Sequence, residues 1–138
     1  MTTNKFIKIL IGVALVTGSL AQAKADGTVT DPTGTYIWTM PGRNGGPDRT
    51  NTLVLKLDGT NLTGNLLAPR RGGVISTNAI SGGTISGATV SFAVVRTYND
   101  NTFTNSYTGT LTNGTITGQV SFQRDGDTQT RDWVATKQ

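Results

Sequence analysis

Apolar and polar residues alternate along most of the chain from residue 33 onward. Val90, Phe92 and Val94 fall on one side of such a segment, and Leu53 and Leu55 do so in another. The side chains of a β-strand point alternately to its two faces, so this spacing is typical of strands with one buried face. No spacing of 3.6 residues, which would indicate an amphipathic helix, follows residue 25. The pattern predicts an all-β domain.

Glycine-containing turns separate these segments. One motif recurs three times: an apolar strand end, a turn with glycine, an apolar residue, and then Thr or Ser followed by Gly. The three turns are Asp58-Gly59, Gly82-Gly83 and Asn113-Gly114. Such pairs tolerate the positive φ that tight hairpin turns require, so we expect a hairpin at each of them. The trailing glycines Gly64, Gly87 and Gly118 are expected to mark bulges or bends.

These boundaries define eight short strands. They are expected near residues 33–40, 50–57, 61–68, 74–80, 84–96, 102–111, 115–124 and 128–136. Eight strands with mostly short connections favour an antiparallel up-and-down (meander) barrel, because closure removes exposed strand edges. An outer-membrane barrel is the alternative, but it requires an apolar outer band. The predicted outer face carries mainly Thr, Ser and Gln, so we expect a barrel that is not embedded in a membrane.

The first 25 residues have the organisation of a secretory signal peptide. Lys5 and Lys8 precede an apolar run over residues 9–20, and Ala23-Lys24-Ala25 fits the small-x-small cleavage pattern. An uncleaved anchor is the alternative, although a spanning helix needs about 20 apolar residues. We expect a protein exported to the periplasm or the extracellular space. Its parts are a signal peptide (1–25), an N-terminal extension (26–32) and the barrel domain (33–138).

Removal of the signal peptide changes the charge of the protein. The full chain has a net charge of +4, but Lys5, Lys8 and Lys24 belong to the signal peptide. The residues from Asp26 onward carry 9 basic and 8 acidic groups, a net charge of +1. A basic face for nucleic acid is therefore not expected.

The chain contains no histidine, no cysteine and no glutamate. It therefore lacks Ser-His and Cys-His nucleophile systems and the usual zinc ligands. A glycosidase would need two facing aspartates, and most of the aspartates fall in predicted turns, where Asp is common for local hydrogen bonding. We expect a protein that is not an enzyme and that holds no metal and no cofactor.

Three short motifs fall at the first strand, after the first tight turn and in the last strand. They are Gly34-Thr35-Tyr36-Ile37-Trp38, Leu62-Thr63-Gly64 and Trp133. Together with the strand order they resemble the calycin group, which includes streptavidin-like proteins and lipocalins. This resemblance implies a meander barrel, often with a ligand in its mouth. The ending Trp133-Val134-Ala135-Thr136-Lys137 is also similar to short exported bacterial proteins of unassigned function.

The resemblance does not extend to the biotin pocket. Streptavidin-like proteins line that pocket with several tryptophans, whereas this chain has only Trp38 and Trp133 and offers Phe92, Tyr107 and Phe122 in its central strands. We therefore expect no biotin binding.

Antiparallel order places every second connection at the same end of the barrel. The connections near 41–49, 69–73, 97–101 and 125–127 then share one end. All seven arginines lie at or near this end: Arg43, Arg49, Arg70, Arg71, Arg96, Arg124 and Arg131. Arg49, Arg96, Arg124 and Arg131 are in phase with the apolar faces, so we expect them to point inward at the rim.

Inward-facing guanidinium groups bind carboxylate or phosphate oxygens through two parallel hydrogen bonds. The sequence therefore predicts a binding module that takes a small polar or anionic ligand, or a carbohydrate, at this end. The segment 41–47 would form a mobile flap. The candidate ligand-binding residues are Arg49, Arg96, Arg124, Arg131, Trp38, Tyr107 and Trp133.

Each part of this hypothesis has a structural alternative. Five aspartates are predicted at the same end, and they would close the barrel by pairing with the arginines: Asp48, Asp100, Asp125, Asp127 and Asp132. The aromatic candidates would then be core residues. The protein would in that case be a non-catalytic structural or protein-interaction module, inhibitor-like or accessory, with a protein partner in place of a small ligand.

Overall fold

The computed structural model describes residues 29–138, and the predicted signal peptide lies outside them. Eight antiparallel strands make up most of this part of the chain. Their bounds are β1 Gly34–Met40, β2 Arg49–Asp58, β3 Asn61–Pro69, β4 Ile75–Ser86, β5 Thr89–Tyr98, β6 Asn101–Thr112, β7 Thr115–Arg124 and β8 Asp127–Lys137. One short 3-10 helix, η3 (Arg43–Gly45), lies between β1 and β2. No helix in the described residues is long and apolar enough to cross a membrane.

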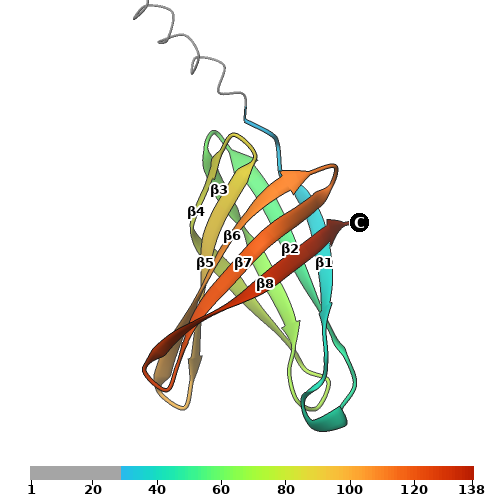
Figure 1. The fold of residues 1–138 in the computed structure, drawn as a ribbon, viewed down its shortest axis with the longest axis vertical. Helices are drawn as coiled ribbons and strands as arrows, with labels where there is room; N and C mark the ends of the chain where they lie inside the picture. Colours follow the sequence, from blue (N-terminus) through green and yellow to red (C-terminus); the bar gives the residue numbers. More distant parts are fainter. Residues whose placement is uncertain (1–28) are drawn as a thin grey trace, which may run out of the picture.

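The strands follow one another in sequence order and close into a barrel (Figure 1). Each strand pairs with the next, and β1 pairs with β8 through Tyr36↔Lys137 and Ile37↔Thr136. This is the up-and-down barrel that the alternation and the turns predict, and it is consistent with the architecture of a calycin-like barrel.

The predicted turn at Gly82-Gly83 is wrong. These residues lie within β4, where the register with β5 shifts between Ser81 and Thr84, and the hairpin turn falls at Gly87 and Ala88. Gly83 runs so close to β3 that an added Cβ would lie 2.3 Å from the carbonyl oxygen of Leu62. The glycine pair therefore serves a bulge in a long strand, which is the other common use of glycine in a sheet.

The trailing glycines have three different roles. Gly64 is not in a bulge: between Leu62↔Gly83 and Asn65↔Ala79, β4 has one residue more than β3, so the bulge lies in β4 and Gly64 lies opposite it. Gly87 belongs to a hairpin turn. No bulge occurs at Gly118, because β7 stays in unbroken register with both of its neighbours at this position.

One end of the barrel, here called the closed end, carries the turns at 59–60, 87–88 and 113–114. Residues 29–33 lead into β1 at this end (Figure 1). The amide N–H of Thr30 donates to the carbonyl of Gly87 (2.9 Å), and Pro32 is fully buried. The hydroxyl of Tyr36 donates to the carbonyl of Pro32 (2.9 Å).

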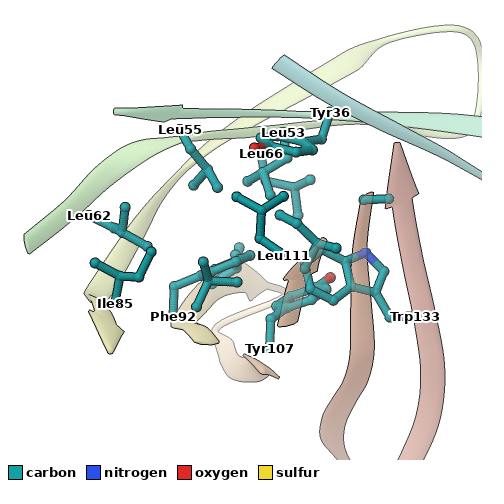
Figure 2. Packing of buried hydrophobic residues seen from close by; sticks show 14 residues of the cluster. Tyr36, Leu53, Leu55, Leu62, Leu66, Ile85, Phe92, Tyr107, Leu111 and Trp133 are labelled. Atoms are coloured by element: carbon teal, nitrogen blue, oxygen red, sulfur yellow. The ribbon is translucent and has the colours of Figure 1, made fainter. Parts of the chain in front are cut away.

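The core fills the middle of the barrel and its closed end (Figure 2). It is built from inward-facing residues of all eight strands, including Leu53, Leu66, Val90, Ile116 and Ala135. Because each of these side chains leaves water almost completely, burial of this cluster is the main source of stability. The core does not extend to the end of the barrel where the arginines are expected. That end is therefore available for a site.

The other end, here called the open end, carries the remaining four connections. Those at 41–48 and 70–74 are long, as expected. The other two were expected to be longer but are two-residue turns, at Asn99-Asp100 and Asp125-Gly126.

Candidate functional site

The barrel wall is split at the open end along two seams. Between β1 and β8 the last pair is Ile37↔Thr136, so Trp38–Met40 has no partner in β8. Between β4 and β5 the last pair is Ile80↔Val94. Beyond these points β4 pairs only with β3, and β5 pairs only with β6.

The seams divide the open end into two lobes, which diverge in the lower part of Figure 1. The first lobe consists of residues 38–51 and 67–79, and the second lobe consists of residues 95–105 and 122–135. Each lobe contains two hairpin ends from four consecutive strands.

Large inward-facing side chains lie at the seam between β1 and β8. If the register of Ile37↔Thr136 continued, Trp38 would lie opposite Ala135, and Met40 would lie opposite Trp133. The two indole rings already meet edge to face, with 5.6 Å between ring centroids. Two tryptophans and a methionine therefore lie on the inner faces of the two strands at the seam, where β1 and β8 diverge.

The two lobes enclose a cavity of about 830 Å³ at the open end. Six arginines line it, three from each lobe. Arg49, Arg70 and Arg71 come from the first lobe, and Arg96, Arg124 and Arg131 come from the second. The four arginines predicted to point inward at one rim are therefore brought together, and Arg70 and Arg71 join them.

The described residues that line this cavity include no carboxylate. All five aspartates predicted at this end are exposed. Among the described residues, one ion pair between arginine and aspartate forms, from Arg124 Nε to Asp125 Oδ2 at 3.7 Å, and both side chains are mostly in solvent. Exposed pairs of this kind contribute little to stability. The positive charge of the cavity is thus largely uncompensated by the protein.

Arg96 is the least exposed of the six arginines that line the cavity. Its Nε is buried and has no hydrogen-bond partner among the described residues. A buried donor without an acceptor is unfavourable by about 1–3 kcal/mol, so proteins rarely keep one without a reason. Arg131 lies over the ring of Phe122, with 5.1 Å from Cζ to the ring centroid. This contact holds the Arg131 guanidinium at the cavity wall.

The aromatic candidates lie below the arginines and pack on one another. Tyr107 stacks on Phe92 with ring centroids 5.0 Å apart, and Trp133 meets Tyr107 edge to face at 5.1 Å. Trp38 contacts both Tyr107 and Trp133. Trp133 and Tyr107 are almost fully buried. These three residues form the floor beneath the arginine cavity and are not among the residues that line it.

Tyr107 connects the floor to the arginines. Burial raises the pKa of its hydroxyl above the ordinary value of 10.0, and the charge of Arg96 and a hydrogen bond with Asn105 lower it by less. The hydroxyl therefore stays protonated and neutral at physiological pH. The floor adds no negative charge that would neutralise the arginines from below.

The sequence-based choice of site residues omitted several that line the cavity. Arg70 was placed at the correct end but not assigned to the site, although it continues the inward phase of Leu66 and Ala68. Tyr98 and Phe103 form an exposed aromatic part of the rim, and Asn105 adds a polar side chain. The alternation of β5 and β6 contained a signal for these three residues, because it places them on the inward face.

A second cavity, here called the side cavity, lies at the seam between β1 and β8 and has a volume of about 590 Å³. Trp38, Trp133 and Val120 line it, and it shares Met40, Phe122 and Arg131 with the arginine cavity. The shared residues come from both lobes, so the two cavities adjoin each other between the lobes.

Fold and site together define a closed antiparallel β-barrel of eight strands with an arginine-lined cavity at one end. Comparison with protein-family models, curated proteins and solved structures finds no match. The inference of function therefore starts from the site itself.

Proposed function

We propose that this protein is a non-catalytic binding module of calycin-like architecture, which takes a small anionic ligand in the arginine cavity. The observation that carries the proposal is the gathering of six arginines around one cavity without a carboxylate in its lining. A volume of about 830 Å³ lies within the usual range of ligand pockets, which is roughly 300–1,000 Å³. Carboxylate or phosphate groups would supply the missing negative charge.

Two features favour an anion over a neutral carbohydrate. The buried Nε of Arg96 lacks an acceptor, and a ligand oxygen would provide one. A neutral sugar would leave the arginine charges uncompensated in a partly desolvated cavity, which is unfavourable.

Phosphate and citrate titrations test this function. Inorganic phosphate or citrate should shift the amide resonances of residues around the open end in NMR spectra. In the variant Arg49→Met/Arg124→Met, which removes one arginine from each lobe, affinity should fall at least about 100-fold. Each hydrogen bond to a charged group contributes about 1.5–3 kcal/mol. The control is Lys56→Met, on the outer face of β2.

Two results would count against the proposal. The first is the absence of any shift at the open end at millimolar phosphate and citrate. The second is an equal loss of affinity in Lys56→Met, because general charge attraction would then explain the binding.

We also propose that the protein is exported and that it acts after removal of residues 1–25. The support is the arrangement of Lys5, the apolar run 9–20 and Ala23-Lys24-Ala25. Intact-mass spectrometry of the protein secreted by a bacterial host should give a chain that begins at Asp26, or at Lys24 if cleavage follows Ala23. Recovery of a chain that still carries Met1 from the exported fraction would refute cleavage.

A further inference from the structure

The seam between β1 and β8 leaves a long strand edge without a partner. β8 pairs with β7 from Asp127 to Thr136, but on its other side it pairs with β1 only at Thr136 and Lys137. Within residues 29–138, the edge from Asp127 to Ala135 therefore has no strand partner over nine residues. Natural proteins usually cover such an edge or guard it with proline or with inward-pointing charges, because it is a ready template for another strand. This edge has no proline, and the inward-pointing charge that lines the side cavity, Arg131, would disfavour an apolar or basic strand but attract an acidic one.

The free edge of β8 borders the side cavity. Five consecutive β1-side residues, Ile37 to Pro41, line one wall of this cavity, and Arg131 to Val134 line the opposite wall. The seam therefore holds space for side chains beside the unpaired main chain of β8. Trp133, which lines this cavity, has an indole N–H that is buried without a hydrogen-bond partner.

We propose that the free edge of β8 binds an extended acidic peptide segment, which adds as a strand in the seam between β1 and β8. Strand addition uses the main-chain groups of an edge for affinity, and it uses pockets for alternate side chains for selectivity. At this edge the alternate side chains that face inward would meet the side cavity and the arginines that adjoin it.

The inward residues of β8 indicate which peptide fits. From the open end toward the closed end they are Gln129, Arg131, Trp133 and Ala135. Trp133 and Ala135 are buried, and Gln129 and Arg131 precede them at intervals of two residues. A peptide residue opposite Arg131 should be acidic, and a residue opposite Trp133 should be apolar or aromatic. These two positions are two residues apart, because side chains on one face of a strand repeat with period two.

The direction of the peptide follows from the direction of β8. β8 runs from the open end toward the closed end, so a peptide antiparallel to it runs outward. The apolar residue then comes first, and the acidic residue follows two positions later.

A second copy of this chain is a poor occupant. The inward residues at its own unpaired edges are Gln129, Arg131 and Trp133 in β8, Trp38 and Met40 in β1, Ser76 and Asn78 in β4, and Arg96 and Tyr98 in β5. None of them is acidic, so a copy of any of these edges in the seam would place no carboxylate on Arg131. Charge complementarity therefore favours an acidic segment of another protein.

A disulfide staple across the seam tests the proposal. Continuing the register of Ile37↔Thr136 places Thr39 opposite Val134, and both side chains point outward. In Thr39→Cys/Val134→Cys, oxidation should draw the ends of β1 and β8 together, because a disulfide requires Cα atoms about 4.4–6.8 Å apart, and reduction should release them. Loss of both free thiols on oxidation shows that the staple has formed. A displayed library of random eight-residue peptides is selected against the reduced form and counter-selected against the oxidised form.

We expect enrichment of peptides with an acidic residue two positions after an apolar one. For an enriched peptide, N-methylation of a main-chain amide within the motif should lower affinity at least about tenfold, and so should Arg131→Glu in the protein. A lysine in place of the acidic residue should restore binding to Arg131→Glu. The charge swap and the N-methylation use the unstapled protein, so they test the proposal even if the staple does not form.

Three results would overturn the proposal: no enrichment over the oxidised form, enriched peptides insensitive to N-methylation, or a concentration-dependent dimer that the staple abolishes. The oxidised variant should still respond to phosphate, because neither Thr39 nor Val134 lines the arginine cavity. If phosphate binds but no peptide is enriched, this inference fails and the proposed anion binding stands. If peptides bind but phosphate does not, the proposed anion binding fails and this inference stands.

Discussion

Replacing Gly64 by alanine is expected to cost about 3–5 kcal/mol of unfolding free energy. Gly64, which lies opposite the bulge of β4, has a φ of 152°, a backbone conformation open almost only to glycine and costly by about 1–3 kcal/mol for other residues. An added Cβ would lie 1.8 Å from the carbonyl oxygen of Val54, so β2 and β3 would have to separate. Overpacking of this kind adds about 1–3 kcal/mol.

A loss of this size is a large part of the total stability, which is about 5–15 kcal/mol for a typical domain. Urea denaturation followed by tryptophan fluorescence measures it. Gly59→Ala is the matched control: Gly59 also has a positive φ, of 65°, but no atom lies within 4 Å of the added Cβ. It should cost only about 1–2 kcal/mol. Equal losses in the two variants would show that close approach of β2 to Gly64 has no importance.

Arg96→Met is expected to stabilise the protein while it weakens anion binding. Removing the buried Nε, which has no acceptor, should raise the unfolding free energy by about 1–3 kcal/mol. Methionine keeps most of the apolar contact that the stem of arginine makes. The change also relieves repulsion among the six arginines that line the cavity.

The effect on binding is measured as ligand-induced stabilisation. At a phosphate concentration 100 times the Kd, the wild-type protein should gain about 2.7 kcal/mol. A tenfold weaker variant should gain only about 1.4 kcal/mol at the same concentration. If Arg96→Met instead destabilises the protein and leaves the phosphate response intact, Arg96 has a structural role and does not serve a binding site.

Much of the barrel could be predicted because local signals agree with the global fold. The alternation in β5 specifies a strand with one buried face, and the turn at Asn113-Gly114 specifies a hairpin. The hairpin expected at Asp58-Gly59 forms one residue later, at Gly59-Thr60. Hairpins in succession give a meander. Gly82-Gly83 shows where this reasoning fails. A glycine pair suits a turn and a bulge equally well, and the approach of Gly83 to Leu62 of β3 decided between them. That contact is not local in sequence.

The gathering of the arginines at one end could be predicted from the antiparallel order of the strands and from the alternation of side chains along each strand. Antiparallel order sends Arg49, Arg96, Arg124 and Arg131 to one end, and strand phase turns them inward. The seams were not predictable, because they depend on how large side chains such as Trp38 and Trp133 share the interior of the barrel. The predicted strand boundaries do not say how much of the barrel interior each side chain occupies.

Both ends of the described chain lie at the closed end. Thr30 is held there through Gly87, and the amide of Gln138 donates to the carbonyl of Thr35 at 2.9 Å. A tether at either terminus would therefore orient the molecule with its arginines facing bulk solution. The barrel can be immobilised on a biosensor surface, or fused to a reporter, without obstructing the pole where recognition is proposed.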